Sequence, residues 1–208
     1  MAQYFEIHPE NPQLRLIHRT VDLLNTGAVI AYPTDSSYAL ACRIDDKKAL
    51  ERIRDIRQLN DRHNFTLICS NMAQIAEFGK ISNDAHRMIK VLTPGPYTFV
   101  LKATRELPKR LIHVKRKSVG FRIPDHPVAL DLLENLAAPL FSTTMILPGE
   151  NQALESPWEI REQLEHQVDL VIDAGYIAYQ PTTIISFMED EPEVIREGKG
   201  KLPDFLQT

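Results

Sequence analysis

The feature that most constrains the fold is an amphipathic stretch that leads directly into a short apolar run. Residues 12–26 carry apolar side chains at roughly helical spacing and end before Gly27, a plausible helix C-cap. Residues 28–32 are then continuously apolar, and Pro33 closes the run, which is typical of a buried strand. A helix followed at once by a buried strand favours an α/β domain.

The same alternation continues along the chain. The spacing of apolar residues predicts further helices over residues 47–59, 71–78, 82–92 (with Ser82 as N-cap), 126–136 and 157–165. Short apolar runs predict strands over residues 65–69, 97–101, 118–123, 140–144, 168–172, 183–187 and 194–195. Helices alternate with strands early and strands cluster late, so we expect one mixed sheet. Without a repeat or a linker, the sequence predicts a single domain over residues 1–208, with its core at about 14–201.

Composition indicates the cellular compartment of this domain, the state of its cysteines and the origin of any affinity for phosphates. The N-terminus shows no signal-peptide pattern and no apolar run is long enough to span a membrane, so we expect a cytoplasmic protein. Cys42 and Cys69 lie in apolar segments, which favours free buried thiols over a disulfide. The formal net charge is −4, so any affinity for phosphates must come from a local basic patch.

Hydroxyl side chains follow the first buried strand. Thr34, Ser36 and Ser37 stand where α/β sheets commonly meet ligands, and their hydroxyls suit a carboxylate or an amine. The alternative is a plain turn in which Asp35 and the serines satisfy nearby backbone groups.

Two basic stretches are candidates for anion binding. Arg57 ends a predicted helix and Arg62 follows it, which suits a fork for phosphate oxygens or, alternatively, a solvated helix face. The segment 109–117 contains five cations, which predicts either a nucleic-acid or triphosphate surface or an exposed loop. The cations of this segment are Lys109, Arg110, Lys115, Arg116 and Lys117.

Hydroxyls and arginines recur at the ends of other predicted strands. They are Ser118, Arg122, Thr144, Thr182 and Arg196. No clear acid/base pair accompanies them, and the sequence lacks a P-loop, a Rossmann fingerprint, a zinc-ligand spacing and a nucleophile elbow. The pattern predicts a site that holds and orients anions, with no catalytic residue and no metal ligand assigned.

Taken in order, five segments resemble the YrdC/YciO family, and its YciO branch most closely. They are residues 32–38 (YPTDSSY), 93–98 (TPGPYT), 122–127 (RIPDHP), 181–184 (PTTI) and 196–198 (REG). The resemblance implies a YrdC-like fold, which is a twisted open α/β sheet of mixed strands with flanking helices and a concave basic face. It also implies L-threonylcarbamoyladenylate synthase activity, a nucleotidyltransferase reaction in which threonine, bicarbonate and ATP give threonylcarbamoyl-AMP and pyrophosphate for tRNA processing.

The resemblance also implies roles for single residues. Thr34, Arg122 and Thr182 stand at threonine-binding positions. The implied nucleotide-binding positions are Arg57, Arg62, Ser118, Thr144 and Arg196. ATP is the implied substrate, with Mg²⁺ as its companion.

Two departures from the family pattern predict weak or altered activity. Residues 57–60 (RQLN) replace the family's Lys-x-Arg followed by proline, and residues 144–149 (TMILPG) replace its Ser-Ala-Asn-x-Ser-Gly. An alternative hypothesis is therefore a double-stranded RNA or tRNA binder without catalysis, in which the cations of residues 109–117 contact RNA. A third is a small-nucleotide sensor.

Overall fold

The computed structural model of the chain describes residues 1–59, 65–113, 115–189, 191–203 and 206. Its helices are α1 (Leu14–Asn25), α2 (Lys47–Arg57), α3 (Met72–Phe78), α4 (Asn83–Leu92), α5 (Pro127–Leu136), α6 (Pro157–Leu164) and the 3₁₀ turn η1 (Lys109–Leu111). Its strands are β1 (Gln3–Glu6), β2 (Ile30–Pro33), β3 (Tyr38–Arg43), β4 (Thr66–Ile68), β5 (Gly79–Lys80), β6 (Tyr97–Ala103), β7 (Ser118–Arg122), β8 (Leu140–Thr144), β9 (Leu170–Asp173), β10 (Thr183–Ser186) and β11 (Glu193–Arg196). None of the described helices is long and apolar enough to cross a membrane.

The predicted helices form close to their expected limits because the sequence caps them. Gly27 follows α1 with φ +91°, a conformation that glycine adopts without strain. The Ser82 hydroxyl accepts a hydrogen bond from the Ala85 amide at 3.2 Å, which confirms it as the N-cap of α4. Both cysteines are free and buried, as expected.

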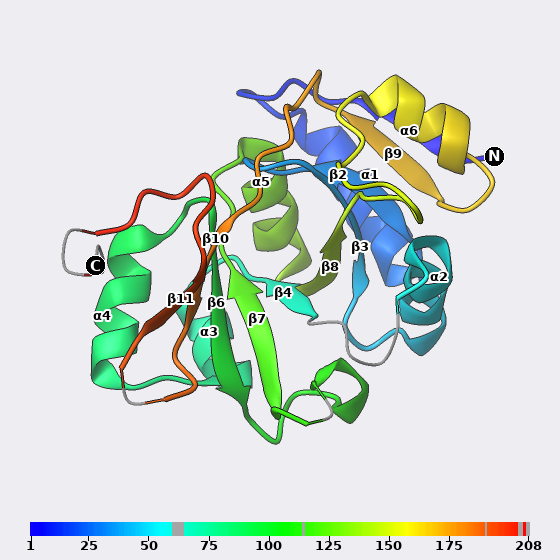
Figure 1. Ribbon diagram of the computed structural model, residues 1–208. Helices are drawn as coiled ribbons and strands as arrows, with labels where there is room; N and C mark the ends of the chain where they lie inside the picture. The colour runs from blue at the N-terminus through cyan, green and yellow to red at the C-terminus, as the bar shows by residue number, and fades with distance from the viewer. Residues whose placement is uncertain (60–64, 114, 190, 204–205, 207–208) are drawn as a thin grey trace.

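One open sheet connects all the strands. Its order is β1-β9-β2-β3-β8-β4-β7-β6-β10-β11, with β5 paired to β6 beside this path. Parallel pairs (β1–β9, β2–β9, β4–β7 and β6–β10) alternate with antiparallel ones. Figure 1 shows β6, β7, β10 and β11 on one side of the molecule and β2, β3 and β8 on the other, with β4 between them. The predicted α/β class with an open mixed sheet and flanking helices is confirmed.

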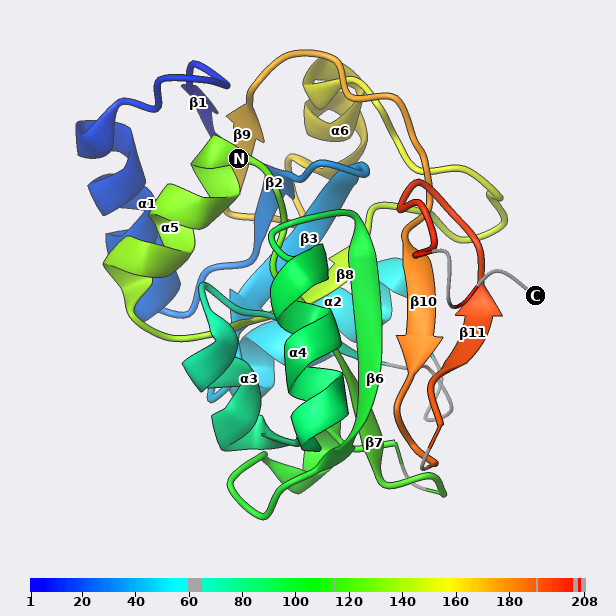
Figure 2. The same ribbon diagram turned by 90° about the vertical axis from the view of Figure 1, so that its left-hand side faces the viewer.

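The two faces of the sheet are covered unequally. Apolar side chains of α2, α3, α4 and α6 form one buried cluster with Phe99, Phe121 and Phe141 of the strands. On the opposite face, α1 and α5 pack together against β2 and β9 (Figure 2). On that opposite face, Ile68 of β4 and Leu140 of β8 belong to the same buried cluster as α5, and residues of β8, β4, β7, β6 and β10 line a cavity beside it.

Three strands escaped prediction. β1 pairs with β9, which lies more than 160 residues away in the sequence, so no local sequence pattern indicates that β1 is a strand. β3 follows β2 after a short turn and is almost entirely buried, so its sequence lacks the alternation of a half-exposed strand. β5 is only two residues long.

Candidate ligand-binding site

The floor of the cavity is a row of short side chains on neighbouring strands. Val100 pairs with Gly120, Gly120 with Thr66, and Thr66 with Ser142, so these residues face the same side. A Cβ at Gly120 would lie 2.9 Å from the Thr66 Oγ1, so glycine allows the strands to pack closely there. The alternate residues Phe99, Phe121 and Phe141 point into the core on the other face. The floor is therefore rigid and wide.

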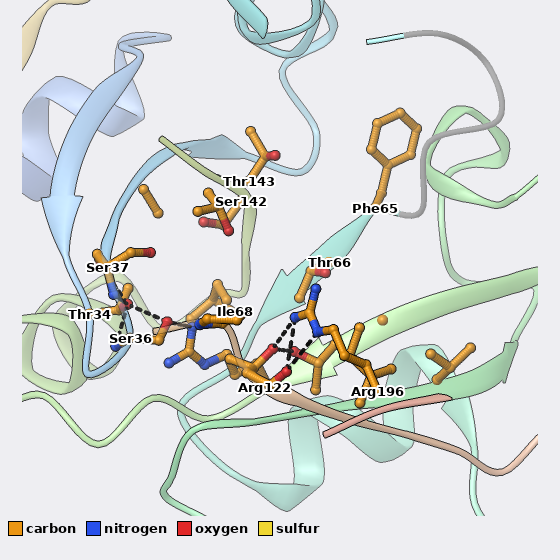
Figure 3. Close-up of a pocket in the computed structure, with 18 of the residues that line it drawn as sticks. Thr34, Ser36, Ser37, Phe65, Thr66, Ile68, Arg122, Ser142, Thr143 and Arg196 are labelled. Carbon is orange, nitrogen blue, oxygen red and sulfur yellow. Dashed lines mark hydrogen bonds between the residues drawn. The ribbon is translucent and has the colours of Figure 1, made fainter. Parts of the chain in front are cut away.

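The cavity has a volume of about 430 Å³ and gathers residues that are far apart in the sequence. Its lining includes Thr34, Arg57, Arg122, Thr182 and Arg196. Figure 3 shows the hydroxyl turn, Arg122 and Arg196 following one another along the wall. The structure thus places these five residues in one cavity, as an anion-binding site built from them needs.

The turn between β2 and β3 is both a turn and part of the wall. The Thr34 Oγ1 donates to the Ser37 carbonyl at 2.7 Å and accepts from the amides of Ser36 and Ser37 at 3.2 Å. The Thr34 hydroxyl is therefore satisfied within the turn, a role that the sequence analysis did not assign to it. In Figure 3 the Ser37 hydroxyl points away from Thr34, which leaves it available to a ligand.

Arg122 is held at this end of the cavity by a buried ion pair. Its Nη2 contacts the Asp35 carboxylate and its Nη1 donates to the Ser36 Oγ at 2.8 Å. The two side chains of the pair are only 8% and 9% exposed. The Asp35 Oδ2 and the Arg122 Nε are buried without a partner among the described residues. Because Asp35 neutralises Arg122, this end of the cavity has little net charge.

Arg196 fixes the next part of the wall, beside Arg122 (Figure 3). Its Nε and Nη2 donate to the Thr182 carbonyl at 3.1 and 2.9 Å, and the Thr182 hydroxyl pairs with that of Thr98 at 2.8 Å. Backbone and side chain of Thr182 are therefore both held in place, which orients its hydroxyl in the cavity. The groups that accept hydrogen bonds from Arg196 are neutral, so no carboxylate of the described chain compensates its positive charge.

Arg57 is a half-buried cation at the C-terminal end of α2. Its Nε is buried and has no hydrogen-bond partner in the described part of the chain. Burial lowers the pKa of Arg57, and the phenol of Tyr179 opposes that shift. Burying an unpaired charge is unfavourable, so this position is suited to an anionic ligand.

The remaining predicted site residues are placed differently. Thr144 lines the cavity, whereas Ser118 is buried on β7 and is not part of the lining. Arg62 lies outside the described residues.

The basic segment splits into two parts. Arg116 lines the cavity, and Lys115 and Lys117 are exposed beside it. Lys109 is exposed on η1, but the guanidinium of Arg110 donates to the Ile44 carbonyl at 2.9 Å and so serves the fold.

An apolar shelf completes the cavity on the side of β10 and β11. It consists of Val100, Ile184, Met188 and Ile195, and Ile146 lines the cavity separately, after β8. Ile195 is 49% exposed although it is a large apolar residue. An apolar surface beside unpaired arginines suits a ligand with both an apolar and an anionic part.

The expected Mg²⁺ finds no protein ligands here. The cavity lining in the described chain contains no aspartate or glutamate, and no cluster of three His, Cys, Asp or Glu residues exists among the described residues. Since Mg²⁺ is usually held by at least one carboxylate, the residues present do not fit a magnesium site built by the protein.

Sequence analysis missed several lining residues, among them Thr98, Tyr179 and the apolar shelf. Thr98 lies in a predicted strand, and only the pairing of β6 with β10, in which it stands opposite Ile184, places it beside the cavity. Tyr179 lies in an irregular segment without periodicity, although it closely precedes the Pro181-Thr182 motif. Its closeness to that motif in the sequence was the signal that could have identified Tyr179 as a site residue.

The family model described as "Telomere recombination", which covers Sua5, YciO and YrdC proteins, matches residues 22–198. The chain belongs to the Sua5/YciO/YrdC family. It is 50% identical over 206 residues to the uncharacterised protein YciO of Escherichia coli K12, covering 99% of this chain and 100% of that one. The crystal structure of E. coli YciO superposes with a TM-score of 0.93, over 97% of this chain and 98% of that chain.

More distant members carry a named activity. A threonylcarbamoyl-AMP synthase of Vibrio vulnificus is 28% identical over 159 residues, which is 75% of this chain and 84% of the relative. P. abyssi Sua5, crystallised with L-threonine, shares the fold at 23% identity and a TM-score of 0.86, over 94% of this chain and 57% of that one. The chain is thus a member of a family that includes threonylcarbamoyl-AMP synthases.

Proposed function

We propose that this protein binds ATP and a small amino acid in the cavity and joins them as a carbamoyl adenylate, in the manner of L-threonylcarbamoyladenylate synthase. The observation that carries the proposal is the convergence of Thr34, Arg57, Arg122, Thr182 and Arg196 on one cavity. Its volume of about 430 Å³ lies within the range of small-molecule sites. The threonylcarbamoyl-AMP synthases among its relatives, and the L-threonine complex of P. abyssi Sua5, support this choice of reaction.

The charges of the cavity assign its two ends. Arg122 is already paired with Asp35, so its end suits a zwitterion such as a free amino acid. Thr34 organises the turn, and Ser37 and Thr182 offer hydroxyls to that amino acid. Arg57, Arg116 and Arg196 line the cavity without a carboxylate among the described lining residues, and these cations suit the phosphates. The apolar shelf suits the adenine ring of ATP.

The reaction follows from this placement. A carbamate formed from the amino acid and bicarbonate directs one oxygen at the α-phosphorus of ATP. A new P–O bond forms, the bond to the β-phosphate breaks, and pyrophosphate leaves with the electron pair. Catalysis requires positioning and neutralisation of phosphate charge, for which guanidiniums suffice. No side chain is required as a strong base at the reacting atoms.

Product analysis tests this proposal. Purified protein is incubated with ATP, labelled bicarbonate and either threonine, serine or no amino acid, and pyrophosphate and labelled adenylate are measured. We expect amino-acid-dependent formation of both, at least tenfold lower in Arg57→Met, because a charge-assisted hydrogen bond contributes about 1.5–3 kcal/mol. If no amino acid supports formation of an adenylate, the proposal is wrong.

A second candidate function, RNA binding, rests on a basic surface outside the cavity. Lys80 lies directly opposite Lys102 across β5 and β6, although like charges at such positions repel. Lys102 also pairs with Ser118 of β7, next to the exposed Lys117. The phosphates of RNA would relieve this repulsion. RNA affinity should then fall steeply with salt and should fall further in Lys102→Gln. Affinity that is flat with salt argues against this function.

A further inference from the structure

The segment between β9 and β10, residues 174–182, forms one wall of the cavity. We call it the strap; it is the orange segment joining these strands in Figure 1. It contains no helix or strand, yet Tyr179, Pro181 and Thr182 all line the cavity. An irregular segment cannot satisfy its own backbone groups, so its position depends on partners elsewhere.

One side chain supplies most of the partners at its centre. The Glu155 Oε1 accepts a hydrogen bond from the Tyr179 amide at 2.6 Å, and the Oε2 accepts one from the Tyr176 hydroxyl. The Glu155 carbonyl also accepts from the Ile177 amide at 3.1 Å. Beyond these contacts, the Gln180 amide donates to the Ser36 carbonyl at 2.9 Å. Glu155 therefore fixes the backbone on the N-terminal side of Tyr179, and the hydroxyl turn fixes it on the other side.

Tyr179 itself has an unused group in the cavity. It is half-buried, and its hydroxyl has no hydrogen-bond partner within the described part of the chain. Arg57 lines the same cavity, and its Nε also lacks a partner there. Two donors from remote segments that line one cavity, without a carboxylate among the described lining residues, favour an anion with several oxygens.

We propose that Tyr179 contacts the phosphates of the bound nucleotide together with Arg57, and that Glu155 is the positioning residue that holds Tyr179 there. This inference rests on the proposed function for its ligand. It assigns to the strap a hydroxyl donor on the side of the cavity where the chain departs from the family's Ser-Ala-Asn-x-Ser-Gly pattern. Glu155 touches no ligand in this assignment, since it acts through the strap backbone.

Two measurements test the two parts separately. Hydrogen exchange of the Ile177, Tyr179 and Gln180 amides is measured on the free protein, and ATP and pyrophosphate binding are measured by calorimetry. The variants are Glu155→Ala, Glu155→Gln, Tyr179→Phe and, as a control of equal charge change on α6, Glu162→Ala. Thermal unfolding of each variant shows whether the whole fold is intact.

We expect Glu155→Ala to exchange the Tyr179 amide about tenfold faster and to bind ATP several-fold more weakly, while Glu162→Ala behaves as wild type. Glu155→Gln retains an acceptor for this amide and should recover most of both losses. Tyr179→Phe should bind ATP and pyrophosphate about tenfold more weakly with unchanged exchange of the strap.

Each part has its own contradicting result. Unchanged exchange in Glu155→Ala refutes the positioning role, and this arm needs no ligand. Unchanged affinity in Tyr179→Phe, when wild type binds ATP, refutes the phosphate contact alone. If wild type binds neither ATP nor pyrophosphate, the proposed function and the Tyr179 assignment both fail, and hydrogen exchange still decides the role of Glu155.

Discussion

Removing Asp35, the buried ion-pair partner of the cavity residue Arg122, should destabilise the protein strongly. Asp35→Ala leaves the guanidinium of Arg122 without its ion-pair partner at a position where both side chains are less than a tenth exposed. Breaking a buried pair in this way costs about 3–5 kcal/mol. Arg122 borders the cavity, whose water can partly solvate it, so we expect the lower end, about 3 kcal/mol. For a chain of this size that loss lowers the Tm by roughly 6–12 °C.

Equilibrium unfolding in urea measures this loss, and a double-mutant cycle isolates its cause. Arg122→Met removes the charge but keeps an apolar stem, and the double variant Asp35→Ala/Arg122→Met should be more stable than the two single losses predict by about 2 kcal/mol. Asp84→Ala is the matched control, because its ion pair with Arg87 is 92% and 80% exposed and should contribute less than about 1 kcal/mol. Strict additivity, or an Asp35→Ala variant as stable as the control, would refute the reasoning.

Three further predictions concern single residues. Arg57→Met should abolish most of the rise in Tm that ATP causes in wild type, because the unpaired cation is replaced by a side chain that cannot bind phosphate; an equal rise measured by differential scanning fluorimetry excludes Arg57 from the phosphate site. Burial lowers the pKa of His126, which Asp35 and Asp125 oppose, so the unfolded state binds a proton more readily than the folded state, and stability should fall as the pH drops below about 6.5. Urea unfolding between about pH 7.5 and 5.5 should show a smaller fall in His126→Asn, and identical slopes contradict this explanation. In Gly198→Ala the new Cβ would lie 2.2 Å from the Pro181 carbonyl oxygen, so we expect a loss of about 1–3 kcal/mol in urea unfolding, and wild-type stability would show that this approach is not tight.

Local sequence signals were sufficient to predict most of the helices and strands. The C-cap at Gly27, the N-cap at Ser82 and the apolar run before Pro33 are determined by neighbouring residues, and the elements that they delimit form as predicted. β1 depends on pairing with β9, so its existence is decided by contacts that no window of sequence contains. The expected single domain over residues 1–208 stays a prediction.

Site residues that stand in a motif at the end of a strand could be predicted from the sequence. Site residues that enter the cavity only through the pairing of strands could not. Arg122 and Thr182 stand at strand ends, and the sequence alone marked both of them. Tyr179 and the apolar shelf come to line the same cavity as Arg57 only through the order of the strands and the course of the strap. The roles of the predicted residues, including Arg62 outside the described chain, stay predictions.

The row of Val100, Gly120, Thr66 and Ser142 has a consequence for how substrate range can change. Gly120 and Ser142 leave no freedom for change, because a Cβ at Gly120 would meet the Thr66 Oγ1 at 2.9 Å and the Ser142 hydroxyl is bonded to Tyr32 and Leu40. Val100 and Thr66 are different: they line the cavity on one side of the sheet, so a longer side chain at either position takes up room in the cavity and not in the core behind the sheet. The capacity of the cavity is thus adjustable at two positions while the strands that form its floor stay the same.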